Sequence, residues 1–243
     1  MDRNSEVYHH LDEMSESHRS AEKVVPVILS VTGPVRSVVD LGGGDGGWLR
    51  VFQQNGVEEI LLIDCPEVAS HLVIDKRYLQ PCDLSSDLPT PHRFDLAVCL
   101  ECAEHLPAHR AEPLVEWLTR SADIVVFSAA IPGQGGKGHI HLKFPDFWEG
   151  LFSRHGFQKH DVLRSRIVTD RSIAYWYRQN IFVFASPTAR LPAGQVALLS
   201  DEFYLIHKEI ANRPVGLGVK ALLRELGPAL VSAIRRWVPG RKA

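Results

Sequence analysis

The stretch from Ser37 to Trp48 constrains the fold of this chain more than any other feature. A β-branched run, Ser37–Leu41, contains Asp40 and leads directly into a glycine cluster, after which the helix-like segment Trp48–Asn55 begins. Glycine has no Cβ, so it adopts positive φ easily and lets a ligand approach the backbone. A glycine turn that enters a helix also presents free N–H groups to that ligand. We expect a nucleoside cofactor at this turn.

Strand-like and helix-like segments alternate beyond the turn. The expected strands are continuously apolar, which is typical of a parallel sheet covered on both faces. They cover Ser37–Leu41, Glu59–Ile63, Tyr78–Cys82, Phe94–Leu100, Asp123–Ala130, Gln158–Leu163 and Asn180–Ala185, and further helices are expected at Pro66–Ile74, Glu112–Ala122 and Phe147–His155. The prediction is an α/β fold with a Rossmann-like, seven-stranded, mostly parallel sheet, helices on both faces and a helical C-terminal extension.

The chain divides into three predicted parts. Residues 1–32 are expected to be helical, with one helix over 1–22 and a second up to Thr32, either as a solvated surface or as a lid over the cofactor. Residues 33–186 form the core, and residues 187–243 form a linker and a helical extension. The last expected helix, Val219–Val238, has a leucine stripe followed by a basic cluster. This pattern is typical of an amphipathic helix that docks on the domain or on a partner, and the alternative is a peripheral contact with a membrane.

Composition narrows the function classes. The net charge is −2 and no basic stripe is present, so we expect no nucleic-acid partner. No apolar run reaches the ~20 residues of a membrane span, and Met1–Glu6 has no secretory character. The four cysteines lie near buried strands, which suggests reduced thiols and a cytoplasmic protein. Cys99 and Cys102 have the C-x-x-C spacing, but without a second pair we read them as small core residues rather than a zinc or redox site.

Acids follow several of the expected strands at the edge where open α/β sheets bind ligands. The glycines satisfy both G-x-G-x-x-G, through Gly42, Gly44 and Gly47, and G-x-G-x-G, so a dinucleotide remains open. Asp64 suits ribose hydroxyls under either interpretation. Asp83 suits an adenine amine, which a nicotinamide enzyme does not usually need. The alternative is that these acids only cap the helices that follow them.

The order of these features resembles the class I S-adenosylmethionine-dependent methyltransferases over residues 20–186. The resemblance implies that the Asp40 glycine segment holds the methionine part, that Asp64 binds the ribose and that Asp83 faces the adenine. The full cofactor site predicted in this way is Asp40, Gly42, Gly43, Gly44, Gly46, Trp48, Asp64, Cys65, Asp83, Leu84 and Glu101.

The segment Leu100–Pro107 carries the candidate catalytic groups. Glu101, Glu104 and His105 can hold a hard divalent cation such as Mg²⁺, or His105 can act as a general base. Similar Glu-x-x-Glu-His segments occur in small-RNA 2′-O-methyltransferases and ubiquinone-pathway O-methyltransferases, where they are associated with metal and with a further histidine. The candidates for that histidine are His139 and His141. Alternatively, both side chains have a structural role: Glu104 caps a helix and His105 packs against its neighbours.

Three other segments resemble a bacterial small-molecule and glycan-pathway methyltransferase subgroup. They are Arg19–Glu22, Phe127–Gly136 and Trp176–Asn180. In that subgroup Gly-His is usually followed by Val-Asn-Glu-Gln-Trp-Pro, so His139 matches, whereas His141, Leu142 and Lys143 depart from the pattern. Trp176, Tyr177 and Arg178 either line an acceptor pocket or pack in the core.

Together these observations predict methyl transfer from S-adenosylmethionine to an oxygen of a small, natural-product or sugar-type molecule. His105 or His139 is the expected base, with Glu101 and Glu104 orienting it or holding a metal. N-methylation, a non-catalytic cofactor-binding partner, a nicotinamide oxidoreductase and an RNA acceptor are the alternatives. An oligomer remains open.

Overall fold

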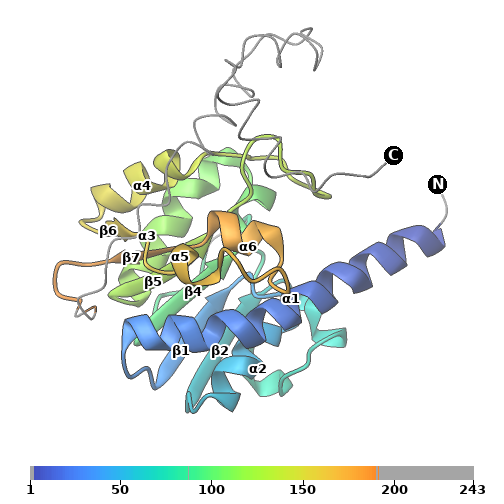
Figure 1. Ribbon diagram of the computed structural model, residues 1–243, viewed down its shortest axis with the longest axis horizontal. Helices are drawn as coiled ribbons and strands as arrows, with labels where there is room; N and C mark the ends of the chain where they lie inside the picture. Colours follow the sequence, from blue (N-terminus) through green and yellow to red (C-terminus); the bar gives the residue numbers. More distant parts are fainter. Residues whose placement is uncertain (1–2, 87, 190, 192–243) are drawn as a thin grey trace, which may run out of the picture. The chain divides into compact units, whose positions relative to one another are not determined.

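A computed structural model describes residues 3–86, 88–189 and 191 of the chain, and every structural statement below refers to these residues. Its centre is a seven-stranded sheet with the strand order β3-β2-β1-β4-β5-β7-β6 (Figure 1). Strand β7 runs antiparallel to its neighbours β5 and β6, and the other pairs are parallel. The strands are β1 Ser37–Leu41, β2 Glu59–Asp64, β3 Leu79–Pro81, β4 Leu96–Leu100, β5 Ile124–Ser128, β6 Gln158–His160 and β7 Phe182–Ala185.

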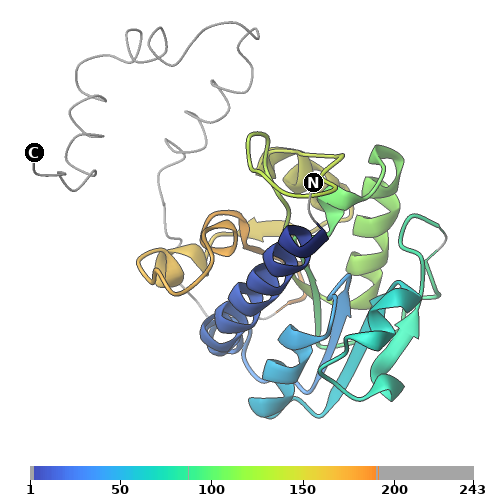
Figure 2. The same cartoon turned by 90° about the vertical axis from the view of Figure 1, so that its right-hand side faces the viewer.

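Helices cover both faces of this sheet. The helices are α1 Arg3–Thr32, α2 Gly47–Gln54, α3 Ala111–Ser121, α4 Pro145–Arg154, α5 Arg164–Ile167 and α6 Tyr175–Asn180. Helices α1, α2 and α6 lie on one face, where apolar residues of all three pack against alternate residues of β1 and β4. Helices α3 and α4 lie on the other face (Figure 2), where Phe127 of β5 packs on Trp148 and Phe152 of α4. The predicted fold of residues 33–186 is therefore confirmed.

The N-terminal segment is one helix, so the prediction of two separate helices was wrong. Pro26 lies inside α1 and removes one backbone donor there. The helix nevertheless continues because one of its faces is buried: Ala21, Val24, Val25 and Ile28 are all 0% exposed. Their spacing of three and four residues presents a single apolar stripe to the sheet. Tertiary burial thus outweighs the local cost of the proline.

Other boundaries differ in the connections between strands. The expected helix Pro66–Ile74 is a 3₁₀ segment at Pro66–Ser70, and further 3₁₀ turns lie at Lys76–Tyr78, Ala103–His105 and Ala108–Arg110. Strand β6 ends at His160 because Leu163 already caps α5. Asn180 was expected to begin the last strand, but it ends α6.

None of the helices in the described part of the chain is both long and apolar enough to cross a membrane. The predicted helices of the C-terminal extension, including the basic cluster after Val219, lie outside the described residues.

Candidate active site

The glycine turn joins β1 to α2 at the carboxyl edge of the sheet. Its shape depends on Asp64 at the end of β2, whose Oδ2 accepts a hydrogen bond from the Gly44 N–H (2.7 Å) and whose Oδ1 accepts one from Cys65 (2.6 Å). Gly43 lies so close to Asp40 that an added Cβ would be 2.3 Å from Oδ2. Two of the predicted acids of the cofactor site, Asp40 and Asp64, are therefore in direct contact with the turn.

Asp40 lies beneath this turn as a buried carboxyl group. It is 2% exposed, and its Oδ1 has no hydrogen-bond partner among the described residues. Burial raises the pKa of Asp40 to about 8, and the charges of Asp64 and Asp45 add to this rise. A buried acid of this kind retains its proton near neutral pH.

We expect the stability of the ligand-free protein to fall between pH 6 and pH 8 because of Asp40. The folded state keeps a proton on Asp40 that the unfolded chain, with its ordinary pKa of 3.8, has already released. The unfolded state therefore binds fewer protons, and the free energy of unfolding decreases by at most about 1.4 kcal/mol per pH unit. Urea unfolding should show a smaller decrease in Asp40→Asn. Asp83→Asn, at an exposed acid with a lowered pKa, is the control and should keep the wild-type slope. Equal slopes in Asp40→Asn and the wild type would contradict this origin.

Helix α1 reaches the turn through two polar side chains that the sequence analysis did not single out. His18 Nε2 lies 2.8 Å from Oδ2 of Asp45, and Asp45 Oδ1 accepts a hydrogen bond from the Gly47 N–H at the start of α2. Ser17 Oγ accepts a hydrogen bond from Trp48 Nε1 (3.1 Å). No local pattern marks these residues, because they lie on a polar helix distant in sequence from the turn. The helix contacts the predicted cofactor site, and its role as a lid stays a prediction.

Asp83 and Leu84 follow β3, where the adenine is expected. Asp83 is exposed, and its Oδ1 accepts hydrogen bonds from the N–H and hydroxyl of Ser85, which hold its pKa below the usual value. Leu84 is buried and faces the glycine turn, 3.4 Å from where a Cβ on Gly42 would lie. In this arrangement Asp83 caps a turn, so contact with adenine stays a prediction.

Cys99 and Cys102 are both buried free thiols. Cys102 lies directly against the turn, because a Cβ on Gly42 would be 2.2 Å from its Sγ. The structure thus places the C-x-x-C pair in close packing beneath the turn, as expected for small core residues.

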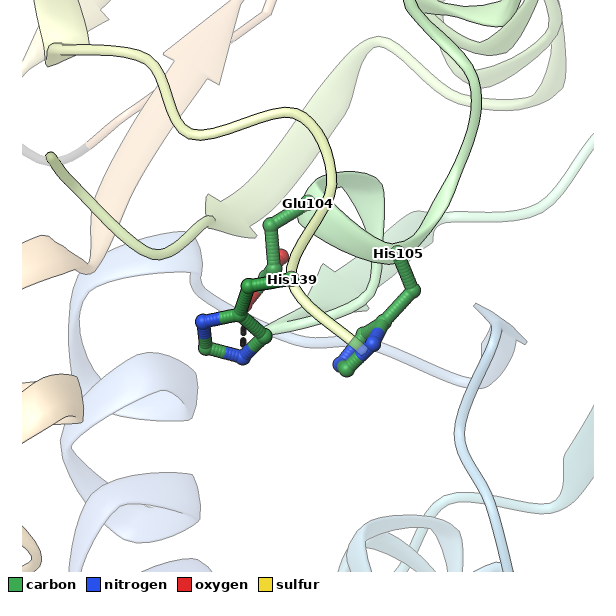
Figure 3. A group of neighbouring side chains, drawn as sticks. All are labelled: Glu104, His105 and His139. Atoms are coloured by element: carbon green, nitrogen blue, oxygen red, sulfur yellow. Dashed lines mark ion pairs between the residues drawn. The ribbon is translucent and has the colours of Figure 1, made fainter. Parts of the chain in front are cut away.

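A second group of polar side chains lies beyond β4, and it contains Glu104, His105 and His139 (Figure 3). One potential ligand atom from each residue lies within 4.8 Å of the other two. Glu104 Oε1 is 3.9 Å from His139 Nε2, and the two imidazole rings are 4.8 Å apart in an edge-to-face arrangement. Glu104 and His105 come from one 3₁₀ turn, whereas His139 comes from the glycine-rich loop after β5. That loop is joined to the turn because the N–H groups of Ile140 and His141 both donate to the Glu104 carbonyl.

Glu104 is the most unusual member of the Glu104–His105–His139 group. Its side chain is 0% exposed, and neither carboxylate oxygen accepts a hydrogen bond from the described residues. Burial raises the pKa of Glu104 to about 8, with the charge of Glu101 as a further cause, whereas nearby backbone N–H groups oppose the rise. A buried carboxyl group whose oxygens accept no hydrogen bond from the described residues, next to two imidazoles, is a donor set that fits a divalent cation.

Packing decides which of the two candidate histidines, His139 or His141, lies beside Glu104. His141 is 6% exposed and lies against the rings of Phe147 and Trp148, where burial lowers its pKa. His139, two residues earlier, lies beside Glu104 instead. Of the two candidates, His139 is therefore the one that the fold brings to Glu104 and His105.

Glu101 is not part of the Glu104–His105–His139 group. Its carboxylate accepts hydrogen bonds from the side-chain amides of Gln134 and Asn180, neither of which was predicted as a site residue. They lie 33 and 79 residues further along the chain, so no local motif relates them to Glu101.

The Trp176–Arg178 segment takes part mainly in packing. Tyr177 is 5% exposed, its ring packs edge-to-face on Trp48 at 4.9 Å, and burial raises its pKa to about 12. Arg178 donates hydrogen bonds to the carbonyls of Ile173 and Val168. These contacts favour the core interpretation of Tyr177 and Arg178 over an acceptor pocket.

Comparison with known proteins shows which families and solved structures this chain is similar to. Residues 8–124 match a family model described as a methyltransferase domain. No curated protein matches the sequence significantly. Among solved structures, DesVI of Streptomyces venezuelae is similar, with 12% identity and a TM-score of 0.56 over 76% of this chain and 99% of that chain.

Two further structures have a similar fold. The S-adenosylmethionine-bound amino pentose methyltransferase CalS10 from Micromonospora echinaspora has 12% identity and a TM-score of 0.54 over 76% of this chain and 97% of that chain. The small RNA methyltransferase HEN1 has 17% identity and a TM-score of 0.50 over 73% of this chain and 26% of that chain. Residues 8–124 thus resemble a methyltransferase domain, and the sheet order agrees with the fold that this chain shares with these solved structures.

Proposed function

We propose that this protein transfers the methyl group of S-adenosylmethionine to a hydroxyl oxygen of a small molecule, with a divalent cation held by Glu104, His105 and His139. The observation that carries the proposal is the close approach of these three side chains beside the strand that neighbours β1. Through Cys102, which touches Gly42, the same 3₁₀ region is packed against the glycine turn. This packing supports a donor site and an acceptor site that lie next to one another.

The sulfonium of S-adenosylmethionine supplies an already activated methyl group, so the protein mainly has to align the acceptor and remove its proton. A divalent cation, when bound, lowers the pKa of a hydroxyl that it contacts. His105 is exposed and its Nδ1 lies 3.2 Å from the Gly138 carbonyl, which orients the ring. With the cation bound, Nε2 would be one of its ligands, and the acidified hydroxyl would give its proton to water as the C–S bond of the donor breaks and the C–O bond forms. Without the cation, the same Nε2 is the atom that we assign to take that proton.

N-methylation is the second candidate. CalS10, which shares the fold, is an amino pentose methyltransferase, and a neutral amine needs no cation to become nucleophilic. A histidine base alone, through His105 or His139, is the corresponding metal-free mechanism.

Turnover with a panel of acceptors tests the proposal. The purified protein is incubated with methyl-labelled S-adenosylmethionine and either hydroxylated sugars and phenols or matched amino sugars, after treatment with chelator and after addition of Mg²⁺ or Mn²⁺. We expect transfer to hydroxyl acceptors that is lost with chelator and restored by metal. Full turnover of the chelated protein, without bound metal, would contradict the proposal that transfer requires a divalent cation. Transfer to the amino sugars alone would favour N-methylation.

A further inference from the structure

Glu101 has an unusual backbone conformation directly after β4. Its φ is +49°, and among the described residues it is the one non-glycine with positive φ. Its N–H donates to the Ser128 carbonyl (3.0 Å), which continues the pairing of β4 with β5. A strained residue of this kind persists only where the surroundings hold it, and such residues concentrate at functional sites.

Two amide side chains hold the Glu101 carboxylate. Gln134 Nε2 donates to Oε2 (2.9 Å), and Asn180 Nδ2 lies 3.2 Å from Oε1 and 3.4 Å from Oε2. Asn180 Nδ2 also donates to Oε1 of Gln134 (2.9 Å), so the two amides support one another. Asn180 is only 2% exposed and comes from the end of α6, whereas Gln134 comes from the loop after β5. The three side chains form a closed network that fixes the direction of Glu101.

The network leaves Glu101 able to accept one more donor. A carboxylate has about four lone-pair positions, and the side chains of Gln134, Asn180 and Ser128 occupy three of them. The charge of Glu101 acts on Tyr177, whose ring packs on Trp48 immediately after the glycine turn. The charge of Glu101 also acts on Glu104. Glu101 directly follows β4, which pairs with β1, the strand that enters the glycine turn, and the group of Glu104, His105 and His139 does not include it.

We infer that Gln134 and Asn180 are positioning residues, which hold the Glu101 carboxylate toward bound S-adenosylmethionine and away from Glu104, His105 and His139. The inference rests on the proposed function for the identity of the metal ligands. It assigns the two glutamates of the Glu-x-x-Glu-His segment to different tasks, with Glu104 serving the metal and Glu101 the cofactor.

Isothermal titration with S-adenosylhomocysteine tests the first half. Glu101→Gln, Asn180→Leu and Gln134→Leu should each weaken binding by about tenfold, as expected for the loss of a hydrogen bond to a charged group. Asn180→Leu should add nothing further in the Glu101→Gln background, because the amide acts through Glu101. Gln158→Leu, which removes an exposed amide on β6, is the matched control and should bind as the wild type does. If Asn180→Leu does not fold, Gln134→Ala in the loop replaces it in the same cycle.

Titration with Mn²⁺ tests the second half. Glu101→Gln should change the Mn²⁺ affinity less than twofold, whereas Glu104→Gln should lower it strongly. The inference is overturned if Glu101→Gln leaves S-adenosylhomocysteine binding unchanged, if Asn180→Leu weakens it further in the Glu101→Gln background, or if Glu101→Gln reduces Mn²⁺ affinity as much as Glu104→Gln does. If even the wild type binds no Mn²⁺, the metal in the proposed function fails, and the S-adenosylhomocysteine cycle alone decides the role of the amides.

Discussion

Gly42→Ala is expected to abolish cofactor binding and to destabilise the protein by about 2–5 kcal/mol, the sum of an overpacking cost and the cost of a left-handed residue. Gly42 has a φ of +80°, and an added Cβ would lie 2.2 Å from Sγ and 2.8 Å from Cβ of Cys102. Cys102 cannot move aside at low cost, because it is buried against the same turn. Thermal unfolding and titration with S-adenosylhomocysteine measure the two effects.

Gly44→Ala is the matched control for this substitution. Gly44 also has a positive φ, of +60°, but nothing lies within 4 Å of its added Cβ. It should therefore show only the conformational cost, about 1 kcal/mol. The double variant Gly42→Ala with Cys102→Gly should recover part of the lost stability, since the clashing side chain is gone. If Gly42→Ala and Gly44→Ala behave alike, close packing against Cys102 is not what requires glycine at position 42.

Glu104→Gln is expected to lower both the Mn²⁺ affinity and the methyl-transfer rate about 100-fold or more, since the loss of even an outer-shell partner of a metal ligand costs about 10- to 100-fold. Glu104 is the one carboxylate of the Glu104–His105–His139 group and accepts no hydrogen bond from the described residues. A neutral amide keeps its shape but removes the charge that would hold the cation. Metal titration and turnover with an acceptor that the wild type methylates provide the measurements.

Glu112→Gln is the control for this second substitution. Glu112 also pairs with a histidine, His155, at 3.2 Å, but the pair is partly exposed and belongs to the α3–α4 surface. It should retain wild-type metal binding and turnover, since exposed ion pairs contribute little. If Glu104→Gln binds Mn²⁺ with the affinity of the wild type, Glu104 is not a ligand of the metal.

The edge of the sheet that carries the site was predictable from the sequence. Asp40, Asp64 and Glu101 each lie in the last residues of an apolar strand or directly after one, and parallel strands bring their carboxyl ends together. The prediction needed only local information, namely strand patterns and the residues that follow them. Local information failed for α1, where the polar, weakly periodic residues 1–22 suggested a helix separate from the one that follows.

The choice between His139 and His141 was not predictable from the sequence. Both lie in one short segment without regular secondary structure, so no periodic pattern predicts which way either side chain points. His141 packs against the aromatic rings of Phe147 and Trp148, whereas His139 lies beside Glu104. That outcome depends on how α4 packs on β5, a contact between segments that no local pattern encodes.

The sequence by itself determined the fold, the glycine turn and the strands that carry the acids, because strand hydrophobicity, glycine conformations and strand-end positions are local properties. Only the tertiary structure decided which polar side chains act together. Gln134 and Asn180 reach Glu101 from distant segments, and Ser17 and His18 reach the glycine turn from α1. Their partners are set by how the loop after β5 and helices α1 and α6 pack at the edge of the sheet, since side-chain hydrogen bonds need contact in space rather than proximity in the chain.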